Sequence, residues 1–113
     1  MSIRSLVAAT FCALALIAGG AQVSAATRKP VTHTVTIDGA RFSPAELTVH
    51  PGDTVVWVNK DILAHTATSK TGGFDSKTIQ PGDSWRYQVK SKTKGEFSYS
   101  CSFHPMNGIL RIK

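Results

Sequence analysis

The chain has 113 residues, with 13 Lys and Arg against 7 Asp and Glu, which gives a net charge of +6 with neutral His. This length provides one hydrophobic core and excludes two domains. The basic residues are dispersed apart from Lys90 to Lys94. Because the chain is predicted to be exported and no nucleic-acid recognition motif is present, nucleic acid is not expected as a partner.

The first 26 residues are predicted to be a secretory signal peptide. A short basic start with Arg4 precedes an apolar run, Leu6 to Ile17, and Val23-Ser24-Ala25 forms a cleavage site with small residues. The apolar run is too short to span a bilayer. Cleavage after Ala25 or Ala26 leaves one domain over residues 27–113, exported to the periplasm, with 12 basic against 7 acidic residues.

The exported domain keeps a single cysteine, Cys101, because Cys12 lies in the signal peptide. One thiol cannot form an internal disulfide, although small exported domains often depend on them. The thiol is therefore either a buried inert side chain or a metal ligand, and protection by a metal fits an oxidising compartment better.

The mature chain reads as all-β. Short segments rich in β-branched and aromatic residues alternate with turns, and Pro51-Gly52-Asp53 and Pro81-Gly82-Asp83 are predicted tight turns. Arg41 to Pro44 is read as a connection. Seven or eight strands are predicted, which indicates a β-sandwich with residues 54–59 as the central strand; they cover residues 31–37, 46–50, 54–59, 66–71, 74–79, 84–89, 96–101 and 108–113.

Three soft or borderline metal-binding side chains follow one another near the C-terminal end: Cys101, His104 and Met106. Alternation along the preceding strand turns Cys101 inward together with Phe97 and Tyr99. A thiolate, imidazoles and a thioether suit copper. His65, between two predicted strands, is the expected second imidazole. His33 and His50 are interpreted as ordinary surface imidazoles.

The wider sequence resembles the cupredoxins of the amicyanin, pseudoazurin and plastocyanin group. The resemblance covers nearly all of the mature chain and rests on Phe42-Ser43-Pro44, Pro51-Gly52-Asp53-Thr54-Val55-Val56-Trp57, His65-Thr66, Phe74-Asp75-Ser76, Pro81-Gly82-Asp83 and Gly95 to Cys101, with the short Cys101-to-His104 loop closest to amicyanin. It implies a Greek-key sandwich, one type 1 copper and one-electron transfer.

By the same resemblance, His65, Cys101 and His104 are the strong copper ligands and a Met is the weak axial one. Relatives usually leave at least two residues between the second His and the Met, whereas only Pro105 separates His104 from Met106. Met106 is the preferred axial ligand, and the Ala64 carbonyl or water are the alternatives. Thr66 either bonds across to the Cys101 loop or is a plain strand residue.

We expect a monomeric electron carrier that meets a redox protein partner at an apolar patch near His104, formed by Leu63, Ala64, Phe103 and Pro105. The positive charge favours either a soluble surface with no further role or attraction to an acidic partner or an anionic membrane surface. The alternatives to electron transfer are copper carried as cargo and zinc on the same ligands. An enzyme is not expected, because a single metal would have no open position and no substrate pocket is apparent.

Overall fold

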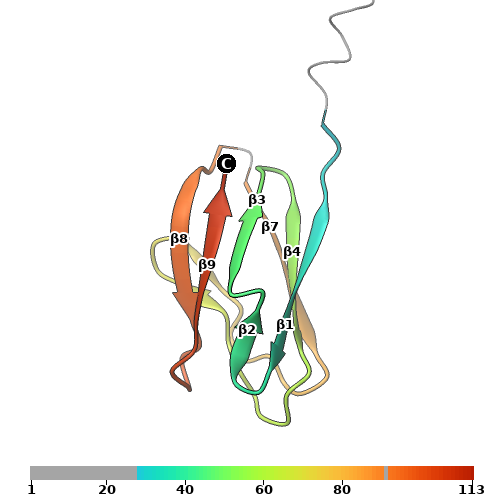
Figure 1. The fold of residues 1–113 in the computed structure, drawn as a ribbon, viewed down its shortest axis with the longest axis vertical. Coiled ribbons are helices and arrows are strands. Elements are labelled where there is room, and N and C mark those ends of the chain that lie inside the picture. Colours follow the sequence, from blue (N-terminus) through green and yellow to red (C-terminus); the bar gives the residue numbers. More distant parts are fainter. Residues whose placement is uncertain (1–27, 91) are drawn as a thin grey trace, which may run out of the picture.

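The computed structural model describes residues 28–90 and 92–113. The predicted signal peptide, residues 1–26, lies outside the described residues. The described chain is all-β, as predicted (Figure 1). No helix in this part is long and apolar enough to cross a membrane. Its strands are β1 (Thr32–Asp38), β2 (Arg41–Ser43), β3 (Glu46–Val49), β4 (Thr54–Asn59), β5 (Thr68–Ser69), β6 (Phe74–Asp75), β7 (Ser84–Gln88), β8 (Gly95–Ser100) and β9 (Asn107–Ile112).

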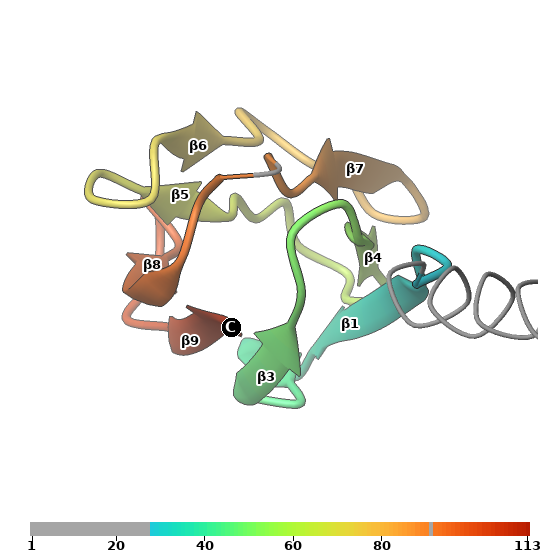
Figure 2. The same cartoon turned by 90° about the horizontal axis from the view of Figure 1, so that it is seen from above.

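The strands form two mixed sheets that face each other across the core, as the view along the strands shows (Figure 2). One sheet has the order β2-β1-β4-β7 and the other β3-β9-β8-β5-β6. The pairs β1 with β4 and β3 with β9 are parallel, and the other paired strands are antiparallel. The predicted sandwich is therefore confirmed, with β4 inside its sheet as expected.

The core is aromatic at its centre. Alternation along β4 buries Val55, Trp57 and Asn59. The Trp57 ring packs edge-on against Tyr99 of β8, with their centroids 5.4 Å apart. Gly108 on β9 faces Tyr99 directly, and a side chain there would lie 2.3 Å from the tyrosine ring. The absence of a side chain at residue 108 thus lets this ring lie flat across β9 and fixes how β8 and β9 pack beside the metal centre.

The structure differs from the predicted elements at two places. Residues 41–44 were predicted to be a connection, but Arg41–Ser43 pairs with the end of β1 as strand β2, because the turn at Gly39 and Ala40 reverses the chain. The predicted strands 66–71 and 74–79 shrink to two-residue strands, β5 and β6. The other residues of these two predicted strands form no strand pairs, apart from Ile79, which forms an isolated bridge with His65.

Candidate metal centre

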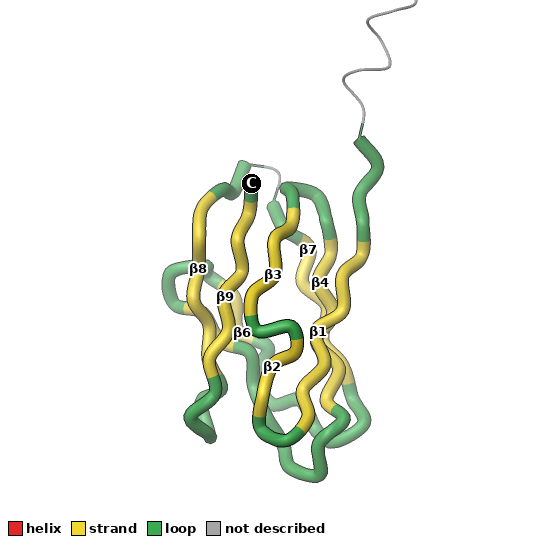
Figure 3. Tube along the Cα trace, viewed as in Figure 1, coloured by secondary structure: helices red, strands yellow, loops and turns green. Residues whose placement is uncertain are grey.

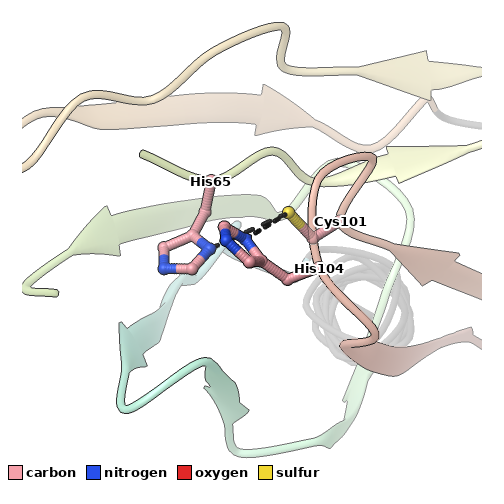
Figure 4. A group of neighbouring side chains, drawn as sticks. All are labelled: His65, Cys101 and His104. Carbon is pink, nitrogen blue, oxygen red and sulfur yellow. Dashed lines mark hydrogen bonds between the residues drawn. The ribbon is translucent and has the colours of Figure 1, made fainter. Parts of the chain in front are cut away.

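Three predicted ligands lie together at one end of the sandwich, which we call the ligand end (Figure 4). His65 follows β4 in the loop that leads to β5, Cys101 comes directly after β8, and His104 lies in the loop between β8 and β9. Cys101 Sγ is 3.8 Å from His65 Nδ1 and 3.7 Å from His104 Nδ1. The possible ligand atoms of His65, Cys101 and His104 all lie within 4.8 Å of one another, close enough to bind one ion.

These distances fit one ion held between a sulfur and two nitrogens. With bonds of about 2.3 Å to sulfur and about 2.0 Å to nitrogen, a flat trigonal site separates sulfur from nitrogen by about 3.7 Å and a tetrahedral site by about 3.5 Å. The separations of 3.8 and 3.7 Å are those of a thiolate and two imidazoles placed around one ion. A trigonal plane of two His and one Cys is the arrangement found in blue-copper sites.

The Cys101 sulfur lies in an environment that favours the thiolate. Burial opposes ionisation of this thiol, but hydrogen bonds from the backbone N–H groups of Phe103 and Thr66, together with the polar contacts to the His65 and His104 rings, outweigh it and lower the pKa of Cys101 to about 6. Both N–H groups lie 3.4 Å from Sγ. The metal-binding form of the side chain is therefore available near neutral pH.

His65 is buried, and a carboxylate holds its ring in place. Its Nε2 lies 2.8 Å from Asp61 Oδ2, so the ring donates to the carboxylate and leaves Nδ1 free to bind a metal. Hydrogen bonds from the Ala40 N–H, from His65 and from the Ile62 N–H lower the pKa of Asp61. Asp61 therefore stays ionised and fixes which nitrogen of His65 faces Cys101.

A buried asparagine fixes the loop that carries His65. Asn59 Nδ2 donates to the carbonyls of Leu63 and Ile79, at 2.9 and 2.8 Å, and its Oδ1 accepts from the Asp61 N–H. His65 and Ile79 also exchange backbone hydrogen bonds of 3.2 and 2.7 Å. No role was predicted from the sequence for Asn59 or Asp61. The spacing of Asp61 four residues before His65 was the available signal, but it became meaningful only when the loop placed the two side chains together.

Thr66 joins the two ligand loops. Its Oγ1 accepts from the Ser102 N–H at 2.9 Å, and its own N–H donates to Cys101 Sγ. The predicted hydrogen bond across to the Cys101 loop is therefore confirmed. This link and the Asn59 contacts hold the loops of His65 and Cys101 together by hydrogen bonds within the protein.

His104 differs from His65 because its side chain is only partly buried. Exposed apolar side chains occupy the same two loops: Ile62 and Leu63 precede His65, and Phe103 precedes His104, with exposures of 87%, 50% and 54%. We define these three as the apolar patch. Leu63 and Phe103 were expected there and Ile62 was not, while of the other two expected residues Pro105 is exposed and Ala64 partly buried. One imidazole thus links the interior of the site to an exposed apolar surface.

Met106 projects toward the inside of the sandwich. Buried residues alternate from Met106 through Gly108, Leu110 and Ile112, and Cys101, directly after the neighbouring strand β8 of the same sheet, is also buried. The Met106 N–H donates to the His104 carbonyl at 2.8 Å, and its carbonyl accepts from the Cys101 N–H at 3.2 Å. The short loop therefore anchors Met106 by its backbone between two ligands.

His33 and His50 lie at the other end of the sandwich, as their exclusion from the ligand set requires. His33 is not simply a surface imidazole, because its Nε2 lies 2.9 Å from Oδ2 of the buried Asp53. Asp53 also accepts from Arg28 Nη1 and from the backbone N–H groups of Val31 and His50. This network ties the start of the domain to the turn before β4.

A two-sheet β-sandwich with a single His-Cys-His centre in the loops at one end defines a class of small metalloprotein, and the sequence comparisons agree. The Cupredoxin-like domain family matches residues 7–111. The chain belongs to this family. Its cofactor is a single copper ion, which the three converging side chains fit.

Individual relatives point the same way. Amicyanin-alpha of Methylorubrum extorquens is 32% identical over 102 residues, covering 86% of this chain and 84% of the relative. The methylamine utilization protein MauL of Methylophilus methylotrophus is 31% identical over 78 residues, which is 66% of this chain; the match spans 45% of MauL, less than half its length.

Solved structures give the same fold. A purple cupredoxin from Nitrosopumilus maritimus aligns with a TM-score of 0.64 and 26% identity over 72% of this chain and 99% of its own. A copper-containing nitrite reductase from Thermus scotoductus aligns with a TM-score of 0.67 and 30% identity, over 77% of this chain but 23% of the reductase. Amicyanin in a Cu(I) state, at 21% identity over 73% of this chain and 82% of its own, has a TM-score of 0.65 and agrees in fold.

Proposed function

We propose that this domain is an exported one-electron carrier in which His65, Cys101 and His104 hold a type 1 copper. The family indicates electron transfer, and copper supplies it by alternating between Cu(II) and Cu(I). The observation that carries the proposal is the pair of imidazole nitrogens at 3.8 and 3.7 Å from the Cys101 sulfur. A fixed trigonal site limits the rearrangement between the two oxidation states, which makes electron exchange fast.

The side chains have different roles in this proposal. Cys101 supplies the thiolate, stabilised by two backbone N–H groups. His65, held by Asp61, closes the inner side of the site. His104 leads to the apolar patch and is the proposed exit for the electron. Met106 is the proposed axial ligand, because its side chain points inward on the same side of the sheet as Cys101.

Electron transfer is favoured over copper delivery by the burial of the ligands. A protein that hands over its metal needs ligands that a recipient can reach, whereas Cys101 is 6% exposed and His65 fully buried. The match to nitrite reductase covers 23% of that enzyme, so it supports the fold and not its reaction. We therefore propose a carrier and not an enzyme.

The proposed partner is a redox protein that docks on the apolar patch. A contact centred on Ile62, Leu63 and Phe103 places His104 at its middle, and interfaces of this kind have an apolar centre and a polar rim. The net positive charge supports attraction to an acidic partner over a longer range. The predicted signal peptide supports action in the periplasm. The domain is proposed to act as a monomer.

Copper titration tests the proposal. Addition of Cu(II) to the purified exported protein should produce an intense blue or green colour that a reductant bleaches reversibly. Cys101→Ser should remove the colour, since the thiolate supplies the charge-transfer band, while circular dichroism shows that the sandwich remains folded. Serine is close to cysteine in size and offers an oxygen to the Thr66 and Phe103 N–H groups that now donate to Sγ, so we expect the fold to be kept.

Two variants complete this experiment. His65→Ala should disrupt the site, whereas His50→Ala, an imidazole at the other end of the sandwich, should leave the spectrum unchanged. A colourless Cu(II) complex, or zinc bound in preference to copper, would contradict a type 1 centre. A spectrum that survives His65→Ala would show that this ligand is wrongly assigned.

A further inference from the structure

Basic side chains collect at the end of the sandwich opposite the ligand end. We call this group the basic pole; its members are Arg28, Lys29, Lys90, Lys92, Lys94 and Lys113. Three contacts bring their segments together: Arg28 bonds to Asp53, the Gly52 N–H donates to the Val89 carbonyl at 2.8 Å, and the Lys113 N–H donates to the Val49 carbonyl at 3.0 Å. Figures 1 and 3 show the start of the domain, the β3–β4 turn, the β7–β8 connection and the C-terminal residue at this one end.

The pole accounts for the net charge of the described domain. Counting side chains, its six basic residues contact one carboxylate, Asp53, while Glu96, at the same end of the sandwich, is paired with Arg111. The six other basic residues of the described chain are matched by six carboxylates. Several of these are joined directly, since Arg111 contacts Glu46 and Glu96, and Lys77 contacts Asp75. The ligand end and the flanks are therefore close to neutral, and the molecule is strongly polarised.

The lysines of the pole are free to meet an external negative surface. All five are exposed, and none has an ion-pair partner among the described residues. Val31, 45% exposed, is the large apolar side chain near this end, whereas Ile62, Leu63 and Phe103 lie at the ligand end. Protein interfaces are depleted in lysine and have an apolar centre. The apolar patch fits a protein, and the basic pole fits a diffuse layer of negative charge.

The connectivity of the chain favours a membrane as that layer. The described domain begins at Arg28, within the pole, so the apolar run Leu6 to Ile17 is attached at this end by ten residues, 18–27. Until it is cleaved, the predicted signal peptide would therefore hold the domain at the membrane with the pole nearest the bilayer. Anionic lipid headgroups attract Lys and Arg side chains that lie close to the surface.

We propose that the basic pole binds the surface of an anionic phospholipid bilayer, reversibly and by electrostatic attraction. The six basic side chains contact the headgroup layer. The strands project from this layer into the solvent over about 20 Å, the length of a six-residue strand. His104 and the apolar patch then face the aqueous side, where a redox partner can reach them. This binding uses no copper ligand, so it stands or fails separately from the proposed electron transfer.

Vesicle co-sedimentation tests the proposal. The exported protein, with and without copper, is mixed with vesicles of phosphatidylcholine alone or of equal parts phosphatidylcholine and phosphatidylglycerol. We expect binding to the anionic vesicles only, and equally by both forms of the protein. Binding should be lost in 1 M NaCl, where the Debye length falls to about 3 Å. Failure to bind anionic vesicles at low salt would overturn the proposal.

Matched variants separate the pole from net charge. Lys90→Gln/Lys92→Gln/Lys94→Gln should weaken vesicle binding by on the order of 100-fold, since each basic residue near the surface contributes about a fivefold factor. The control is Lys60→Gln/Lys70→Gln/Lys77→Gln, which changes the charge equally outside the pole and should weaken binding far less. Equal losses in the two variants would show that net charge, and not the pole, is responsible.

A kinetic measurement distinguishes a lipid surface from an acidic protein. The pole variant should react with a redox partner in solution as fast as the Lys60/Lys70/Lys77 control. A pole variant that binds vesicles normally but reacts more slowly than this control would overturn the proposal and identify the pole as a protein docking surface. A colourless protein that still binds anionic vesicles would overturn only the proposed electron transfer.

Discussion

Replacing Asp61 by Asn removes one partly buried negative charge beside the metal centre, together with the hydrogen bond from the Ile62 N–H to Asp61 Oδ1. The Asn oxygen can still accept the hydrogen bond from His65 Nε2, now 2.8 Å from Asp61 Oδ2, so the orientation of the ring is kept while the charge is lost. A carboxylate stabilises Cu(II) more than Cu(I), because the ions differ by one positive charge. Asp61→Asn should therefore raise the reduction potential.

The size of this shift follows from the geometry. A metal bound to His65 Nδ1 would lie about 7 Å from the Asp61 carboxylate. This distance is the 2.8 Å contact from Asp61 to Nε2, the width of the ring, and a metal–nitrogen bond of about 2.0 Å. One unit charge at that distance, with an effective dielectric constant of about 20, corresponds to on the order of 100 mV. Because the Asp61 side chain is 12% exposed, solvent screening makes this an upper value.

Spectroelectrochemical titration of the copper protein measures the shift, and the thiolate absorption band shows whether the site is intact. Asp38→Asn is the control, since it makes the same change at an exposed carboxylate at the end of β1 and should shift the potential much less. An Asp61→Asn shift no larger than that of the control, with the absorption band retained, would refute the electrostatic argument. Loss of copper from Asp61→Asn would instead show that positioning of His65 requires the charged carboxylate.

Three further predictions follow from other parts of the structure. Met106→Gln should lower the reduction potential and change the paramagnetic resonance spectrum, because the axial donor tunes both; unaltered values in Met106→Gln and Met106→Leu would falsify the axial assignment. Asp53→Asn should reduce the free energy of unfolding at pH 7 by about 2–3 kcal/mol, because hydrogen bonds to a buried charge are lost, with Asp83→Asn as an exposed control in urea unfolding. Hydrogen bonds hold the pKa of Asp53 well below its usual range despite its burial. The stability that the charged Asp53 contributes is therefore complete above about pH 4, the pKa of an unfolded Asp, and is lost as the pH falls further. A difference in unfolding free energy between the wild type and Asp53→Asn that does not change with pH would contradict this reasoning. Reaction with an acidic redox partner should slow as salt rises, and a rate independent of ionic strength would leave the apolar patch as the main recognition surface.

Much of this protein could be predicted from the order of its residues, because the signals are local. Two-residue alternation marks strands, and it correctly turned Tyr99 and Cys101 to the same buried side. Proline and glycine at Pro51-Gly52 define a turn through their own backbone preferences. Cys101 and His104 lie three positions apart, so the loop between them cannot separate them widely. Fold class, cofactor and most of the candidate ligand set therefore came from patterns within about ten residues.

What the sequence could not show depends on contacts between distant segments. The short strand Arg41–Ser43 exists because the end of β1 offers it free hydrogen-bonding groups, and its own residues carry no clear strand pattern. The support of His65 by Asp61 needs the loop to be folded, since the Ala40 N–H from another strand connection holds the same carboxylate.

The basic pole is the clearest case. In the sequence its members are spread from Arg28 to Lys113 and look like a dispersed, soluble surface. Strands that begin or end at the same end of the sandwich bring them together, as the backbone contacts of Gly52 with Val89 and of Lys113 with Val49 show. Charges act through space and not along the chain, so composition determined the sign and size of the net charge, and only the tertiary structure decided where it acts.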